Sequence, residues 1–238
     1  MKFRKITLFL LILSMVFMVT ACSDNKEPNN TESIPETETE TEEKIVIIDA
    51  MDVLAKAWDE YSVAERFDVM GGHFNNADIG LPAEYDLLQT EDLIEMYCVP
   101  EEYLVRIDDA ATMTDFYNVG RFTVGAYHIS DEIPEVEPDT ELDTDTETET
   151  ETESGEDIAS MSKEEVMKNL AVALKTQMIN NTWHGETPEK VLILEIDKEY
   201  IIALWGRDSL VIQFKQKLET VYEDLVEIMI YENFPENF

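Results

Sequence analysis

The chain has 238 residues, and its 53 acidic residues outnumber the 17 basic ones, which gives a formal net charge of −36 at pH 7. Nucleic acids and anionic membrane surfaces are therefore excluded as expected partners, because proteins bind both through basic patches. Charge of this size bears on solubility and association, and it does not by itself predict a fold.

The first 21 residues have the pattern of a bacterial export signal. The basic start MKFRK precedes fourteen mostly apolar residues, ITLFLLILSMVFMV, fewer than the roughly 20 that a membrane-spanning helix needs. The small residues Val19, Thr20 and Ala21 then stand directly before Cys22, and a polar stretch follows. This arrangement resembles the lipobox of bacterial lipoproteins, which implies removal of residues 1–21 and lipidation of Cys22. An ordinary secretory signal with a coincidental cysteine is the alternative.

A lipid on Cys22 would place the protein on the extracytoplasmic face of the cell membrane, anchored without spanning it. Residues 22–43 then form a linker, which we expect to be disordered because it is acidic and has little apolar surface to bury. Lipidation also leaves Cys98 without a cysteine to pair with, so we expect no disulfide. Because Cys98 lies in the apolar run LIEMYCV, we interpret it as a small buried side chain rather than a nucleophile.

The segment after the linker begins with a predicted helix. In residues 49–61, DAMDVLAKAWDEY, apolar side chains recur at helical spacing, and Asp49 can cap the helix N-terminus. Residues 67–86 are dense in Gly, Asn, Asp and Pro, which predicts a loop.

A short helix and one clear strand follow. The helix is predicted over 91–98, with Thr90 as its cap and Pro100 as its end. Residues 120–129, GRFTVGAYHI, alternate between apolar and other side chains and predict a strand. The run EYLVRID, 102–108, is an open case, because its periodicity fits a strand without requiring one.

Residues 131–157 hold fourteen acidic residues, no basic residue and no aromatic residue. Such a composition cannot bury enough apolar area to offset the entropy lost on ordering, so we expect this tract to be disordered. We interpret it as an insertion inside one domain that covers residues 44–238. The alternative is a linker between two domains.

The part after the acidic tract predicts a helix, a hairpin and a last helix. Ser162 and Glu165 form a capping-box pattern ahead of the first helix. The runs KVLILEI and YIIALWG flank the polar turn DKE and predict a β-hairpin. Asp208 can cap a last helix, along which apolar residues continue at helical spacing to Ile228, so we expect one helix that ends before Pro235.

These elements together predict an α+β fold. A strand, a helix and a hairpin in this order make the split β-α-β pattern, and the right-handed crossover rule puts the last strand between the other two. We expect a small antiparallel sheet of three or four strands, with helices packed on one face.

Several blocks of sequence resemble a group of clostridial-type lipoproteins that carry an uncharacterised domain of unknown function. The blocks are GGHFNN…LPAEYDL, VPEEYLVRIDDAATM, NVGRFTVGAYHI, NNTWHGETPEKVLILEID and YIIALWG. The resemblance covers nearly all of 49–225 except the acidic tract. The resemblance implies a lipobox, an α+β domain and a cell-envelope location, without an established activity or site residues. The long Thr-Glu insertion departs from the compact form of the group, which implies that it is dispensable for folding.

Histidines, with neighbouring polar and aromatic residues, supply the few candidates for a site. The candidates for a pocket lie in the loop after Gly71 and in the turn NNTWHGETP, and they are His73, Asp78, Trp183 and His184. We expect no metal, because no HxH, HxxxH or HExxH pattern occurs. His128 falls on the apolar face of its strand, and we interpret it as a core or edge residue.

Signatures of nucleophilic or nucleotide-dependent enzymes are missing, since the sequence has no GxSxG, P-loop or GxGxxG pattern. We therefore expect a non-catalytic envelope binding or accessory module without a cofactor. Its expected partners are the membrane, through the lipid, and another envelope protein or a cell-wall component. The alternative is an envelope hydrolase or metal-dependent enzyme that uses the loops 71–78 and 183–186. A third hypothesis is a scavenger that collects cations or solutes on its acidic tracts.

Overall fold

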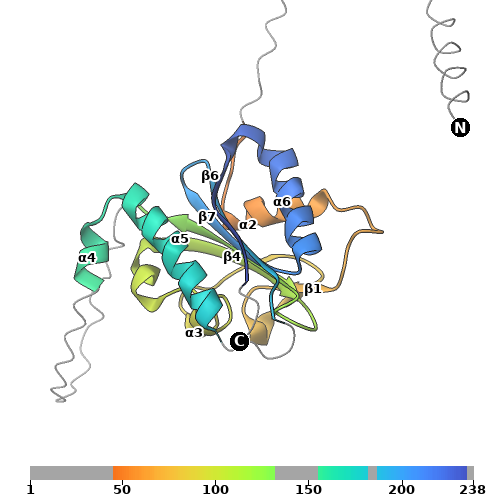
Figure 1. Cartoon of the computed structure of the whole chain (residues 1–238), viewed down its shortest axis with the longest axis horizontal. Coiled ribbons are helices and arrows are strands. Elements are labelled where there is room, and N and C mark those ends of the chain that lie inside the picture. Colours follow the sequence, from red (N-terminus) through yellow and green to blue (C-terminus); the bar gives the residue numbers. More distant parts are fainter. Residues whose placement is uncertain (1–44, 132–154, 182–186, 235–238) are drawn as a thin grey trace, which may run out of the picture. The chain divides into compact units, whose positions relative to one another are not determined.

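A sheet of eight antiparallel strands forms the centre of the structure, a computed structural model that describes residues 45–131, 155–181 and 187–234. These residues belong to one compact unit, Lys44–Phe238. Figure 1 shows helix α5 (Lys163–Asn180) on one side of the sheet and helices α2 (Ala50–Asp59) and α6 (Asp208–Tyr222) on the other. The export signal, Cys22, the linker and most of the acidic tract lie outside the described residues.

The strands differ greatly in length. In chain order they are β1 (Val69–Gly71), β2 (Asp78–Ile79), β3 (Ala83–Glu84), β4 (Ile107–Asp115), β5 (Phe122–Ile129), β6 (Lys190–Ile196), β7 (Tyr200–Gly206) and β8 (Val226–Asn233). Their order across the sheet is β2-β1-β4-β5-β7-β6-β8, and β3 pairs with β4. Strand β5 precedes the acidic tract and β7 follows it, so both parts of the chain contribute to the same sheet.

Short helices connect the longer elements. They are α3 (Glu91–Glu95), α4 (Gly155–Ser160) and the 3-10 helices η1 (Phe74–Asn76), η2 (Glu101–Arg106) and η3 (Glu223–Leu225). Within the described ranges, no helix combines the length and the apolar character needed to cross a membrane.

Each face of the sheet has its own hydrophobic core. Helices α2 and α6 cover one core, and α3, η2 and α5 cover the other. In the first core the aromatic rings stand 4.8 to 6.5 Å apart between centroids, and they are Trp58, Tyr61, Phe67, Phe122 and Phe214. Tilted and edge-on aromatic pairs of this kind each add roughly 0.5–1.5 kcal/mol beyond area burial, so this cluster fixes the helices on their face.

Several predicted elements are confirmed. The Asp49 side chain caps α2 by accepting from the backbone N–H of Asp52 at 2.6 Å. Ser162 and Glu165 form the predicted capping box of α5. The hairpin β6–β7 turns through the three residues Asp197, Lys198 and Glu199, of which the first two have positive φ. Strand β7 lies between β5 and β6, as the crossover rule predicts.

The predicted fold class is nevertheless wrong in two respects. The sheet has eight strands instead of three or four, and helices cover both faces instead of one. Part of the difference lies in residues 67–86, where the predicted loop contains the short strands β1, β2 and β3. These strands lack an apolar pattern because two of them have only two residues each.

Strand β4 has no recognisable strand pattern in the sequence because both of its faces are buried. Residues 110–115 are all buried, so the strand does not alternate between apolar and polar side chains. Its polar side chains find partners on neighbouring segments. For example, the hydroxyl oxygens of Thr114 and of Thr123 on β5 are 2.6 Å apart. The open segment EYLVRID divides between η2 and the beginning of β4.

Strand β8 replaces the end of the predicted last helix. The apolar spacing does continue from α6 to Ile228, but α6 ends at Tyr222, where the next residue, Glu223, has a φ of 34°. Asp208 is the first helical residue rather than the cap, which is Arg207. The chain then adds β8 to β6 because the partly buried side chains of Met229 and Ile230 pack against the α5-side core.

Arg106, at the end of η2, is buried and binds main-chain carbonyl oxygens on both sides of the acidic tract. Its guanidinium donates to Ser130 O at 2.9 Å, to Ile158 O at 3.1 Å and to Met161 O at 2.8 Å. Ser130 N–H in turn donates to Arg106 O at 2.8 Å. One side chain therefore holds together the two ends of the tract.

Substitution Arg106→Met removes these charged donors and leaves buried carbonyl groups unpaired. We expect the free energy of unfolding to fall by roughly 3 kcal/mol, because hydrogen bonds to charged groups each contribute about 1.5–3 kcal/mol. Urea denaturation followed by circular dichroism measures the change. Lys168→Met is the control, since the Lys168 side chain is 64% exposed and should alter the midpoint little. An Arg106→Met midpoint equal to that of the control would contradict the structural role of Arg106.

Candidate functional site

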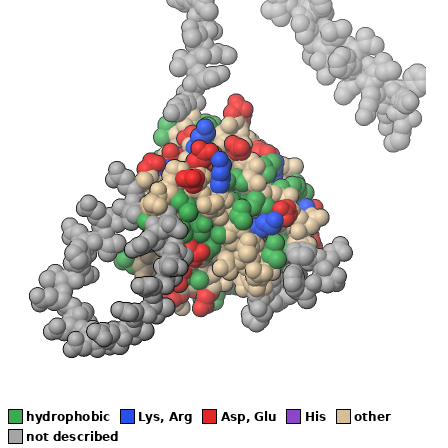
Figure 2. Space-filling model, turned by 60° about the vertical axis from the view of Figure 1, so that its left-hand side comes forward, with side chains coloured by type: hydrophobic (Ala, Val, Ile, Leu, Met, Phe, Trp, Pro, Cys, Tyr) green, Lys and Arg blue, Asp and Glu red, His purple; other side chains and the backbone are tan. Residues whose placement is uncertain are grey.

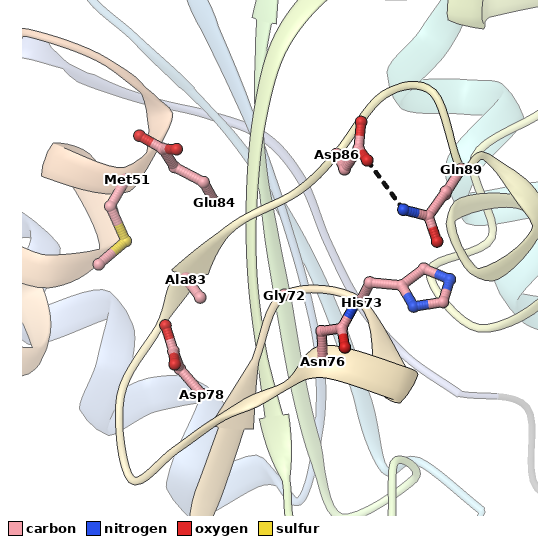
Figure 3. Close-up of a pocket in the computed structure, with 9 residues that line it drawn as sticks. All are labelled: Met51, Gly72, His73, Asn76, Asp78, Ala83, Glu84, Asp86 and Gln89. Atoms are coloured by element: carbon pink, nitrogen blue, oxygen red, sulfur yellow. Dashed lines mark hydrogen bonds between the residues drawn. The ribbon is translucent and has the colours of Figure 1, made fainter.

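A cavity of about 390 Å³ lies beside the short strands β1 and β3 (Figure 3). The residues that line it are Met51, Gly72, His73, Asn76, Asp78, Ala83, Glu84, Asp86 and Gln89. In Figure 3 the side chains of Met51, Asp78 and Glu84 lie toward one end, and those of His73, Asp86 and Gln89 toward the other. The lining contains three carboxylates and neither lysine nor arginine.

The glycine pair Gly71-Gly72 lets two segments of backbone meet at this cavity. A Cβ on Gly71 would lie 2.3 Å from the backbone nitrogen of Ala83, so a larger residue would push β3 away. Gly72 has a φ of 81°, and its N–H donates to the hydroxyl of Thr112 on β4 at 3.1 Å. These contacts place the cavity-lining residues of the 72–78 segment next to those of the 83–86 segment.

His73 is held by its neighbours. Its Nδ1 accepts from the backbone N–H of Asn75 at 3.2 Å, and its Nε2 lies 3.5 Å from a carboxylate oxygen of Asp92. Its ring centroid stands 6.0 Å from that of Tyr85. Both ring nitrogens therefore face partners that belong to the local structure.

The three carboxylates are not equivalent. Hydrogen bonds from the Leu88 backbone N–H and the Gln89 side chain hold the pKa of the Asp86 carboxyl below its usual value, so this group stays ionised near neutral pH. Asp78 and Glu84 are exposed, and within the described residues neither side chain has a hydrogen bond or an ion pair. Two carboxylates thus remain available to a ligand.

The cavity contains two of the four predicted pocket residues, His73 and Asp78. Trp183 and His184 lie outside the described residues, as does Cys22. Other lining residues carry no signal in the sequence, namely Asn76, Glu84, Asp86 and Gln89. The pairing of β3 with β4 brings Glu84 to the cavity, and a two-residue strand has no periodicity that a sequence could show.

His128 lies at the end of β5 between two carboxylates. Its Nδ1 makes a short contact with Asp108, and its Nε2 lies 3.3 Å from Glu199. Lys163 also contacts Glu199, so the ion pairs continue to the first turn of α5. The interpretation as a satisfied edge histidine is consistent with this geometry, in which both ring nitrogens have partners.

Cys98 is 3% exposed and free. Burial raises the pKa of its thiol to about 11, although the Asn181 side chain acts in the opposite direction. A protonated, buried thiol is a poor nucleophile. The interpretation of Cys98 as a small buried side chain is therefore confirmed.

A second cavity, also about 390 Å³, lies between α5 and the strands β6 and β8. Its lining residues are Lys163, Glu164, Met167, Lys168, Glu195, Lys198 and Glu227. Figure 2, which turns the α5 side of Figure 1 forward, shows acidic and basic side chains gathered at one end of the visible face. Glu195 stands directly opposite Glu227 in the register of β6 and β8. Burial, and then the Glu227 carboxylate, raises the pKa of the Glu195 carboxyl.

Among the described residues, no group of three or more His, Cys, Asp or Glu side chains is arranged to hold a metal ion.

The opposed carboxylates predict a pH dependence of stability. The pKa of Glu195 is higher in the folded state than in the unfolded state, so folding favours the protonated carboxyl. The ionised carboxylate therefore destabilises the folded protein fully at pH values above the folded-state pKa. This destabilisation disappears as the pH falls below the unfolded-state pKa. We expect Glu195→Gln to raise the free energy of unfolding at pH 7 by roughly 0.5 kcal/mol, the size of a cross-strand pair. The gain should vanish near pH 4.

Urea titrations across this pH range measure the effect. Glu232→Gln is the matched control on β8, because Glu232 forms an ion pair with Lys175 at 2.6 Å and its removal should not stabilise the protein. A gain for Glu195→Gln that is independent of pH would contradict the repulsion.

Comparison with known proteins gives no identity for the chain: no family model matches it, and no curated protein or solved structure matches it either. The resemblance to clostridial-type lipoproteins therefore stays a prediction.

Proposed function

We propose that this protein is a non-catalytic binding module of the bacterial cell envelope, anchored by a lipid on Cys22, and that its cavity beside β1 and β3 binds a small organic cation. One observation carries the proposal: three carboxylates line the cavity, and no lysine or arginine offsets them there. The anchor rests on the lipobox pattern at residues 19–22.

The size of the cavity favours a molecule over a bare ion. A volume of about 390 Å³ is the volume that roughly a dozen water molecules occupy in liquid water. An amine or guanidinium group can bind Asp78 and Glu84 through charge-assisted hydrogen bonds, which are roughly twice as strong as neutral ones. The apolar side chain of Met51 can contact the carbon chain of such a ligand.

The side chains best suited to acid–base chemistry in this cavity are already engaged. His73 faces Asn75 and Asp92, and Asp86 accepts from Leu88 and Gln89. This arrangement supports binding rather than catalysis. The alternative, an envelope hydrolase or metal-dependent enzyme, is favoured by the shared cavity of His73 and Asp78. It also needs the loop 183–186, which lies outside the described residues.

Binding is tested by isothermal titration calorimetry of the folded chain with agmatine and cadaverine, and with glutamate as an anionic control. We expect the two cations to bind and glutamate not to bind. Glu84→Gln and Asp78→Asn should each weaken cation binding about tenfold, since a hydrogen bond to a charged group contributes roughly 1.5 kcal/mol. Glu101→Gln is the control, because Glu101 is an exposed carboxylate outside the cavity. Equal affinities in all three variants would place cation binding elsewhere, on the acidic tracts for example.

The anchor is tested separately by labelling cells with radioactive palmitate. Cys22→Ala should abolish incorporation, because the thiol that carries the diacylglyceryl group is lost. Cys98→Ala should retain full incorporation, because Cys98 is buried in the fold. Labelling of Cys22→Ala at the level of the unmodified protein would refute the lipid anchor.

A further inference from the structure

Strand β8 is the last strand on one side of the sheet. Its inner edge pairs with β6, and no strand of the described part of the chain pairs with its outer edge. None of its eight residues is buried. In Figure 1 helices α5 and α6 lie on opposite sides of this strand. An edge of this kind presents main-chain N–H and C=O groups that can pair with another strand.

The side chains of β8 differ between its two faces. Ile228 stands opposite Leu194 and Tyr231 opposite Leu192, so both point to the side of α2 and α6. Ile228 is 48% exposed and Tyr231 is 43% exposed. A strand added outside β8 would cover part of this apolar surface.

The other face of β8 is acidic. Glu227 stands opposite Glu195, and Glu232 stands opposite Val191, which belongs to the α5-side core. Glu232 has Lys175 as its partner, whereas Glu195 and Glu227 form no ion pair within the described residues.

The cavity lining contains three lysines and three glutamates, but two of the lysines are already paired. Lys168 is paired with Glu164, and Lys163 with Glu199. Burial first, and then the Glu227 carboxylate, keep the pKa of Glu195 raised although Lys198 and Lys168 act to lower it.

A second copy of the chain fits this edge poorly. Two antiparallel β8 strands centred between Met229 and Ile230 would bring Glu227 of one copy opposite Glu232 of the other, and like charges in that position are destabilising. The net charge of −36 on each chain adds repulsion. The register shift between Ile193 and Leu194 gives β8 an extra residue, Met229, and bulges of this kind discourage unspecific pairing.

We propose that β8 binds an extended segment of another protein in which basic and apolar residues alternate, and that this segment adds a further strand to the sheet. Its apolar side chains would lie beside Ile228 and Tyr231. Its lysine or arginine side chains would lie on the opposite face beside Glu227, where the cavity under α5 opens next to Glu195. Main-chain pairing gives such complexes affinity, and the alternating side chains give them specificity.

The probe is a synthetic eight-residue peptide that alternates valine and lysine, and the readout is amide hydrogen exchange of the full chain at physiological ionic strength. We expect at least tenfold slower exchange at the outward-facing amides of β8. The same peptide with alternate backbone nitrogens methylated keeps its charge but cannot form a ladder, and it should give no protection.

Two variants locate the interaction. Ile228→Lys should weaken peptide binding at least tenfold, because it replaces apolar contact with a repelling charge. Val63→Lys makes the same charge change at a 93% exposed residue far from β8 in the chain, and it should bind as the unmodified protein does. Unchanged exchange in β8 at saturating peptide, or equal binding of the methylated peptide, overturns the proposal. Protection of β8 that grows with protein concentration alone would overturn it in favour of a second copy.

Discussion

Strand β5 and helix α5 are separated in the chain by the acidic tract, and the guanidinium of Arg106 joins them in the fold. A buried cation needs polar partners, and here they are the carbonyl oxygens of Ser130, Ile158 and Met161. Main-chain partners do not depend on side-chain identity. Because the entropy of loop closure grows only slowly with length, the strand–helix–hairpin unit tolerates a long insertion at this point. The sheet, both cores and the β8 edge are built on that unit.

The parts of the fold that could be predicted are those in which local pattern and tertiary contact agree. Strand β5 and the β6–β7 hairpin have apolar runs bounded by turn residues, and α5 has a capping box. Strand β4 could not be predicted, because both of its faces are covered and Thr112 and Thr114 are buried among apolar residues. Strand β8 could not be predicted either, because its apolar residues continue the helical spacing of α6 although the helix ends where Glu223 has a positive φ.

The candidate site shows the same division. His73 and Asp78 stand out because they lie in a loop rich in glycine, and the structure brings both to one cavity. Glu84 and Asp86 reach that cavity only because Gly71 has no Cβ, which lets the backbone of β3 lie directly against it. This contact brings together two segments that share no repeating pattern in the sequence. A sequence pattern can therefore indicate the loop of a site without indicating the opposite wall.

Net charge alone does not decide where a cationic partner binds. At physiological ionic strength the screening length is about 8 Å, so each acidic segment acts mainly on its own surroundings. The register of β6 and β8 keeps Glu195 opposite Glu227. A cation beside this pair gains Coulomb attraction and also relieves a repulsion that the free fold retains. Specific recognition of cations is therefore expected where the fold fixes carboxylates next to each other, as it does for this pair, and it does not follow from the number of acidic residues alone.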